Sequence, residues 1–168
     1  MALINTTTTG VLGSTFFGDG IGSLTVQQNG VTQGIYGNIP AFSAYASAQS
    51  SAITSATDTK VLFDIETFDT NNNFASSRFT PTIAGYYQIN VQVNNDSGLT
   101  ALTAYIYQNG GAGSAAGSAS NATTYISTGS VILYCNGSTD YIELFATHAH
   151  GSTQPMTGSI SACLIRSA

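Results

Sequence analysis

The chain has 168 residues, enough for one domain with a real hydrophobic core, yet only three are Lys or Arg and eight Asp or Glu. The three basic residues are scattered, which argues against nucleic acid and anionic membrane surfaces as partners. No apolar run is long enough to insert into a bilayer. Low charge with many Thr, Tyr, Val and Ile residues favours β structure, and a surface so poor in charge favours an oligomer.

Residues 1–38 form a segment of distinct composition, rich in Gly and Thr. Glycine at this frequency predicts turns and short extended pieces, with one short strand at residues 23–27 that ends at Asn29-Gly30. The segment has neither Gly-x-y repeats nor heptads, so it is not a collagen or coiled-coil stalk. We expect a docking arm. The first residues lack the features of a signal peptide, which predicts synthesis in a host cytoplasm.

Residues 39–168 have the pattern of a β-rich head. From Tyr87 to Val93 every second residue is apolar, which is typical of a strand with one buried face. Asn136-Gly137 marks a turn, and the Gly/Ala/Ser-rich residues 110–120 predict a surface loop. An apolar strand is predicted before the Asn-rich turn at residues 71–73, and further strands near residues 87–93, 102–107, 123–127, 129–135, 140–147 and 157–166. About ten short strands separated by turns predict a double-sheet jelly roll.

The order of aromatic and turn residues in the head resembles the signature of the C1q/TNF-like jelly-roll family. In that family a Phe is followed by Asn or Asp, an aromatic residue, a second Phe and then Gly-x-Tyr-x-Phe. The matching positions are Phe63, Asp69, Phe74, Phe79, Gly85, Tyr87 and Ile89. Ile89 replaces the usual Phe, and the interval from Phe74 to Phe79 is shortened, which alters a loop rather than the sheet. Residues 40–45 resemble the first strand of the family's head, and the resemblance extends over residues 40–166.

The resemblance implies an all-β jelly-roll sandwich that associates as a homotrimer. Heads of this family bury an aromatic and aliphatic face of one sheet around a three-fold axis. Candidates for the trimer interface or the core are Phe42, Tyr45, Phe63, Phe79, Tyr87, Tyr105, Tyr107 and Phe145.

Two pairs of reactive side chains have a structural and a functional interpretation. Cys135 and Cys163 lie in predicted strands, where we expect buried free thiols; a structural disulfide is the alternative. Asp64 and Glu66 alternate on one predicted strand and would share a face. A solvated strand face is favoured there over a cation site or an acid–base pair.

His148 and His150 are the only histidines. On a strand their side chains would share a face, and a three-fold axis would then gather six imidazoles able to hold an axial metal ion. The alternative is a pair of exposed loop histidines. No other cofactor is predicted.

The sequence has no nucleophile elbow, phosphate-binding loop or cysteine-based metal motif, so we predict a protein that is not an enzyme. An arm in place of a stalk, followed by a trimeric β head, favours a virion structural protein of a tailed bacteriophage. We expect a capsid decoration or cement protein, docked by residues 1–38 on the major capsid protein or another virion protein, because the chain has no shaft to project a tip. The alternative is the carbohydrate-binding head of a short tail fibre that meets host-surface glycans.

Overall fold

The computed structural model describes residues 26–28, 31–33, 39–48, 51–95, 99, 101–111, 115–120 and 125–168. The chain divides into two compact units, residues 1–37 and 38–168. In the first unit, β1 (Val26–Gln28) pairs antiparallel with β2 (Val31–Gln33), so strands lie on both sides of Asn29-Gly30 where one strand was expected. The described residues contain no helix, and therefore none that is long and apolar enough to cross a membrane.

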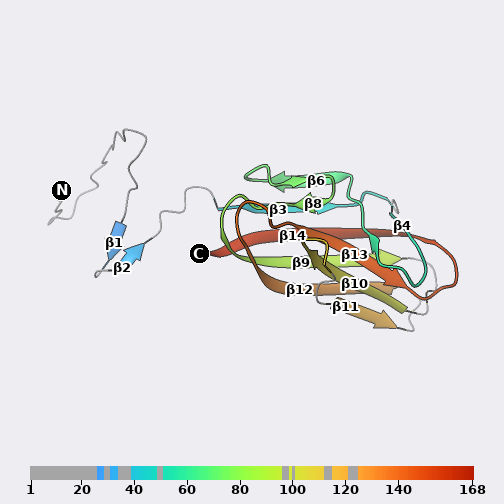
Figure 1. Cartoon of the computed structure of the whole chain (residues 1–168). Coiled ribbons are helices and arrows are strands. Elements are labelled where there is room, and N and C mark those ends of the chain that lie inside the picture. The colour runs from blue at the N-terminus through green and yellow to red at the C-terminus, as the bar shows by residue number, and fades with distance from the viewer. Residues whose placement is uncertain are drawn as a thin grey trace. The chain divides into compact units, whose positions relative to one another are not determined.

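The second unit is a sandwich of two antiparallel sheets (Figure 1). The first sheet has the order β12-β9-β14-β3-β6, with β4 paired to β14. Its strands are β3 (Ala41–Tyr45), β4 (Ser51–Ile53), β6 (Ile65–Asp69), β9 (Gly85–Asn95), β12 (Tyr125–Cys135) and β14 (Gln154–Ser167).

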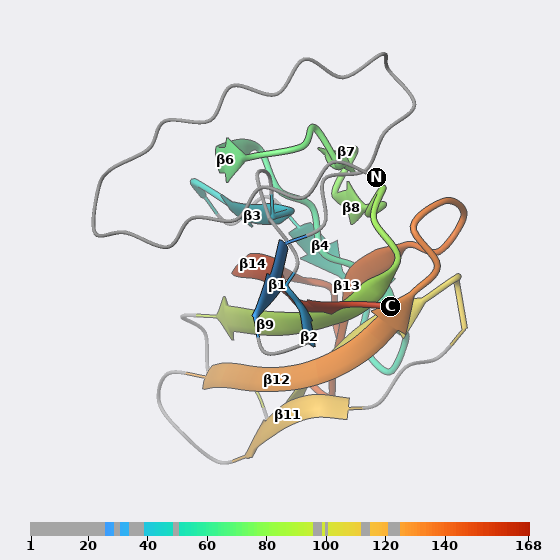
Figure 2. The same cartoon turned by 90° about the vertical axis from the view of Figure 1, so that its left-hand side faces the viewer.

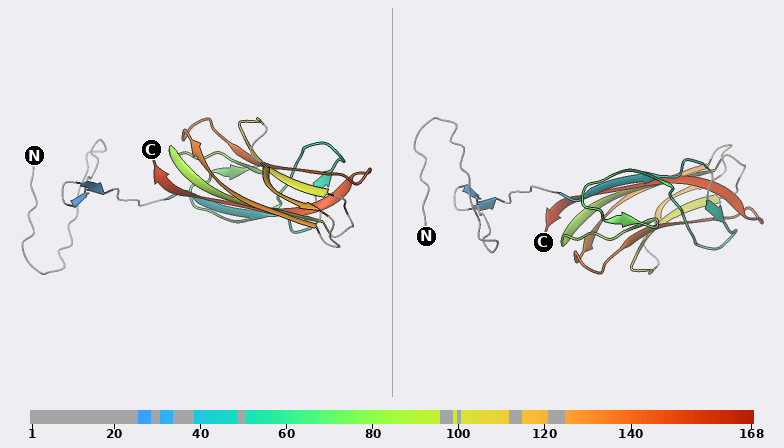
Figure 3. Two further views of the ribbon diagram at one scale, coloured as in Figure 1. Left: turned by 90° about the horizontal axis from the view of Figure 1, so that it is seen from below. Right: turned by 90° about the horizontal axis from the view of Figure 1, so that it is seen from above.

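The second sheet has the order β11-β10-β13-β8-β7, with β5 paired to β13. Its strands are β5 (Thr59–Lys60), β7 (Phe74–Ala75), β8 (Arg78–Phe79), β10 (Ala101–Gln108), β11 (Ala115–Ser120) and β13 (Ile142–His148). Figure 2 shows β12, β9 and β14 side by side in one layer, and Figure 3 shows the long strands of the head running lengthwise through it.

The core lies between the two sheets and is built around an aromatic stack. Phe42 stacks on both Phe74 and Phe79, with ring centroids 4.8 and 4.4 Å apart, and Phe79 meets the edge of Tyr87 at 5.5 Å. The hydroxyl of Tyr87 donates to the Ile83 carbonyl at 2.7 Å, which satisfies the one polar atom of this fully buried side chain. Burial is the main cause that raises the pKa of Tyr87 to about 12. The signature aromatics are therefore core residues.

Two predictions about the strands are wrong. Residues 115–120 form β11, which pairs with the edge of β10, although a surface loop was expected at 110–120. The small Gly, Ala and Ser side chains of this segment give no alternation from which to predict a strand. The strands expected at 123–127 and 129–135 are one strand, β12, which pairs with β9 along its whole length and continues through Gly129.

The connection between β7 and β8 has an unfavourable backbone. Ser76 and Ser77 are its two central residues, and both have positive φ, 52° and 58°. This is the pattern of a type I′ hairpin turn, which Gly and Asn adopt at lower cost than Ser. Ser77 is also buried, and its hydroxyl accepts the backbone N–H of Phe63 at 2.9 Å. The exposed Ser76 side chain accepts no such bond from the residues that the structure describes.

A Ser76→Gly variant should be more stable than the unaltered chain by about 0.5–1 kcal/mol, because glycine relieves the left-handed strain. Urea unfolding monitored by tyrosine fluorescence would measure the difference. The matched Ser77→Gly variant gains the same backbone relief but leaves the Phe63 N–H without its acceptor, so it should be less stable than Ser76→Gly. Equal stabilities for the two variants would contradict this interpretation.

Candidate self-association face

The solvent-facing surface of the first sheet carries the largest group of exposed apolar side chains on neighbouring strands. Along β9 the odd-numbered residues are buried and the even-numbered ones point outward. Strand pairing extends this surface across β12, β14 and β3. We call it the outer face; its residues are Tyr86, Gln88, Asn90, Gln92, Asn94, Ile126, Thr128, Ser130, Ile132, Tyr134, Thr157, Ser159, Ser161, Cys163, Ile165, Ala41, Ser43 and Tyr45.

One end of the outer face is apolar. Tyr86 and Tyr134 are direct cross-strand partners whose rings meet edge to face at 5.5 Å. Together with Ile132 and Ile165 they are 43–52% exposed, a high fraction for such large apolar side chains. Together with Arg166, Ser167 and the C-terminal residue Ala168 they line a shallow hollow of about 550 Å³. Contiguous exposed apolar side chains of this kind mark surfaces that another molecule covers.

The middle of the outer face is polar but carries no charge. Side chains in neighbouring rows bond to one another: Gln88 donates to the Ser130 hydroxyl, and that hydroxyl donates to Asn90 at 2.9 Å. Thr157 likewise donates to Asn94. Because these groups already satisfy one another, covering them costs less than covering unpaired polar atoms. An uncharged centre is also what distinguishes protein interfaces from the rest of a surface.

The structure separates the predicted aromatic candidates into core and surface. Phe42, Phe79 and Tyr87 are core residues, and Phe63 is partly buried and packs against the core. Tyr45, 43% exposed, is the one predicted aromatic that lies on the outer face.

The remaining three candidates belong to the second sheet. Tyr105, Tyr107 and Phe145 lie on β10 and β13 and face away from the core. Tyr107 stacks on Phe145 with centroids 4.1 Å apart, and its hydroxyl donates to Asp58. The hydrogen bond to Asp58, followed by burial, raises the pKa of Tyr107 to about 12. These side chains are half-buried or buried within the single chain, so they form a local cluster apart from the outer face.

Sequence reasoning missed the apolar residues of the outer face. A signal was present in residues 131–135, where apolar side chains occupy both the inward and the outward positions of a strand. A strand with one wet face alternates, whereas an unbroken apolar run indicates cover on both faces. Ile132 and Tyr134 are the outward members of that run.

The two histidines do not share a face. β13 ends at His148, which is buried, with its Nε2 2.9 Å from the Ile53 carbonyl oxygen. His150 lies beyond the strand, is exposed, and bonds to Ser152 and Gln154. The alternative of two exposed loop histidines is therefore wrong for His148. Within the described residues no three His, Cys, Asp or Glu side chains are grouped for a metal ion, and an axial metal stays a prediction.

The two acidic residues are also separated. Asp64 precedes β6 and accepts hydrogen bonds from the hydroxyl and, at 2.7 Å, the backbone N–H of Ser47. These bonds lower the pKa of the Asp64 carboxyl. Glu66 lies within β6 and is exposed. The two were expected on one strand, which is wrong, and each carboxylate lies at the surface.

The two cysteines are both free thiols, but only one is buried. Cys135 is fully buried at the end of β12, and burial, followed by the negative charge of Asp140, raises its pKa to about 11. Cys163 is exposed on the outer face, opposite Gln88, so its predicted burial is wrong for the isolated chain. Cys163 occupies an outward-facing position of β14. Because Leu164 and Ile165 follow it in the sequence, the segment looks uniformly buried.

Comparison with known proteins shows which solved structures have a similar fold. No family model matches the chain, and no curated protein matches it. Among solved structures, the globular domain of a zebrafish complement C1qA protein is 17% identical with a TM-score of 0.61, over 77% of this chain and 99% of that chain. The PRD1 vertex protein P5 is 19% identical with a TM-score of 0.62, over the same shares. Murine APRIL is 8% identical with a TM-score of 0.51, over 73% and 98%.

At these identities the comparisons establish the fold. The chain has the C1q/TNF-like jelly-roll fold, which confirms the resemblance seen in its sequence.

Proposed function

We propose that this chain is a non-enzymatic structural protein of a phage virion, which assembles as a homotrimer through the outer face. In this proposal residues 1–38 dock the trimer on the capsid, as a decoration or cement protein. The observation that carries the self-association is the outer face, whose centre has no charged side chain and whose end exposes four large apolar side chains. The likeness to the PRD1 vertex protein, a phage protein of this fold, supports the virion assignment.

The chemistry of the outer face suits a second copy of the same chain. Tyr86, Ile132, Tyr134 and Ile165 offer apolar surface worth about 25 cal/mol per Å² covered. Symmetric assemblies use the same patch or pair of patches on every copy, and the uncharged centre of the outer face avoids the like-charge repulsion that a symmetric contact would otherwise create there. The partner outside the trimer would be the major capsid protein or another virion protein.

Cys163 is a built-in reporter of this association. In the native trimer a maleimide at pH 8 should label neither thiol rapidly, because Cys163 is covered and the raised pKa of Cys135 keeps that buried thiol protonated. Denatured protein should label at both. Rapid labelling of Cys163 in the native protein, or a light-scattering mass that is not three times 17.3 kDa, would overturn the proposed trimer.

Particle location tests the docking part of the proposal. Gold-labelled antibody should decorate the capsid densely, in numbers that match its symmetry. Deleting residues 1–38 should leave a folded trimer that no longer binds particles. A truncated chain that still decorates capsids would refute docking by this segment.

The same labelling experiment discriminates the alternative function. A carbohydrate-binding head of a short tail fibre would be present in a few copies at the tail. Label on neither capsid nor tail would reject the virion assignment altogether.

A further inference from the structure

A second pocket, of about 490 Å³, lies apart from the outer face and shares no residue with it. Lys60 and Arg78, two of the three basic residues of the chain, line it. They come from β5 and β8, strands that each pair with β13. In a protein with a formal charge of −5, this is the one place in the described residues where two cations converge.

Both cations are held by one buried carboxylate. Lys60 Nζ and Arg78 Nε donate to the same oxygen of Glu143, at 2.7 and 2.9 Å. Burial by itself would raise the pKa of Glu143, but the hydrogen bonds from Lys60 and Arg78 outweigh it and leave the pKa below its ordinary value. Glu143 therefore stays ionised at neutral pH, and the three side chains together carry a net charge of +1.

Arg78 is fixed in a position that leaves its outer donors available. Its Nε is engaged by Glu143, and its guanidinium carbon lies 3.9 Å from the centre of the Tyr141 ring. In the part of the chain that the structure describes, neither terminal nitrogen of Arg78 has a hydrogen-bond partner, and the side chain is 44% exposed. An arginine restrained in this way loses little entropy when its two terminal nitrogens bind an anionic group with two oxygens.

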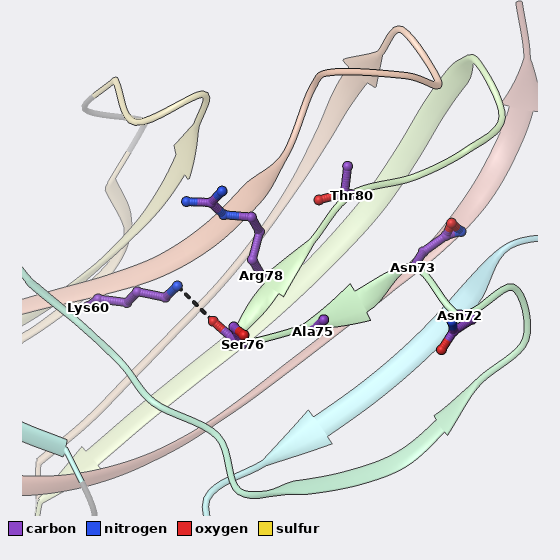
Figure 4. A pocket seen from close by; sticks show the side chains of 7 residues that line it. All are labelled: Lys60, Asn72, Asn73, Ala75, Ser76, Arg78 and Thr80. Atoms are coloured by element: carbon purple, nitrogen blue, oxygen red, sulfur yellow. Dashed lines mark hydrogen bonds between the residues drawn. The ribbon is translucent and has the colours of Figure 1, made fainter.

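The rest of the pocket is polar and neutral. Figure 4 shows Lys60, Arg78 and Ser76 toward one side and Asn72 and Asn73 toward the other, with Thr80 between them. Lys60 also donates to the Ser76 carbonyl at 2.9 Å, which fixes its ammonium group at the pocket wall. The Asn73 amide is buried and bonds to Thr82, whereas the exposed Asn72 amide and Ser76 hydroxyl can bond the hydroxyls of a sugar whose acidic group the cations bind.

We propose that this pocket binds the anionic group of an acidic saccharide, a sugar that carries a carboxylate or a phosphate. An acidic peptide suits it less well. Peptides gain affinity from strand edges and apolar side-chain pockets, whereas the adjoining edge strand β7 has two residues and Ala75 is the single apolar residue in the lining.

Titration of the ¹⁵N-labelled full chain, followed by NMR, tests the proposal. Glucuronic acid or glucose 6-phosphate should shift the Arg78 Nε–H signal and the amides of residues 72–80, with a Kd of about 1 mM. Comparison of the two sugars identifies the preferred anionic group. Neutral glucose should cause no shift at the same concentration, and added salt should weaken binding.

Substitutions separate the pocket from the net charge of the protein. Arg78→Gln should weaken binding about ten-fold. Thr103→Asp changes the net charge by the same one unit, on β10 and away from the outer face, and should leave the affinity unchanged. Asn72→Ala keeps the ion pairs intact and should weaken binding about three-fold, which serves as the test if Arg78→Gln fails to fold.

Four results would overturn the proposal: neither acidic sugar binds; free sulfate binds as tightly, which means an adventitious ion only; a blocked Glu-Glu dipeptide binds as tightly, which means a peptide site; or Arg78→Gln and Asn72→Ala both bind like the unaltered chain. None of these results depends on the location of the protein in a virion or on its oligomeric state.

Discussion

An Ile132→Asp variant should be a monomer at concentrations where the unaltered chain is a trimer. Ile132 lies at the apolar end of the outer face and is 52% exposed in the single chain, so the substitution disturbs the isolated fold little. In the trimer, each copy would instead bury an unpaired carboxylate, at a cost of about 2 kcal/mol or more. Three copies together would weaken the assembly by about 6 kcal/mol, roughly four orders of magnitude in the dissociation constant. Light scattering coupled to size-exclusion chromatography measures the mass directly.

A matched variant on the second sheet distinguishes a specific effect at the outer face from a general effect of the added negative charge on the trimer. Thr103 also points outward from a strand, β10, but lies away from the outer face. Thr103→Asp adds the same charge and should leave the trimer intact. Rapid maleimide labelling of Cys163 in Ile132→Asp, but not in Thr103→Asp, would show that the outer face itself had opened. Dissociation of both variants, or of neither, would contradict the assignment of the interface.

A Gly137→Ala variant should lose about 3–5 kcal/mol of unfolding free energy. Gly137 has a φ of 73°, and a Cβ atom there would lie 2.3 Å from the backbone nitrogen of Ala84 and 2.7 Å from the carbonyl carbon of Ile83. Both contacts are with main chain, so no side-chain rotation relieves them. The neighbouring Asn136 also stabilises the turn. Its Oδ1 accepts the backbone N–H groups of Ser138, Thr139 and Asp140. Urea unfolding would measure the loss.

Gly151→Ala is the control for backbone strain. Gly151 has a similar φ of 84°, but a Cβ atom there would have nothing within 4 Å. Its substitution should therefore cost only the left-handed conformation, about 1 kcal/mol. The difference between the two variants isolates the close approach of the 136–140 turn to the chain that enters β9. Similar losses for both would show that the close approach is not tight in solution.

Alternation and aromatic spacing were sufficient to predict the fold. Period-two hydrophobicity in β9 identifies which of its side chains enter the core, and Phe74, Phe79 and Tyr87 occupy the places that the signature implies. Such patterns report local geometry and the need for burial. The Asn136-Gly137 pair likewise predicted a turn, because a tight turn needs a residue with positive φ and Gly137 has one.

The candidate sites were predicted less well, because they depend on contacts between segments distant in sequence. The environment of His148 is set by the Ile53 carbonyl, and the pocket beside Arg78 needs Lys60 and Glu143 from two other strands. The residues next to His148 and Arg78 in the sequence give no indication of the hydrogen bond to Ile53 or of the pocket. The apolar end of the outer face was missed as well, although the unbroken apolar run at 131–135 was a local signal for it, because such a run is typical of a strand covered on both faces.

The position where the chain enters the head has a consequence for binding strength. Pro40 accepts a hydrogen bond from the backbone N–H of Leu164, next to Ile165 at the apolar end of the outer face. In a trimer joined through that end, the three chains would enter their heads at points close to one another. Once one segment is bound, the other two are held near the same surface at a high effective concentration, so even weak individual contacts would give a long-lived attachment through avidity.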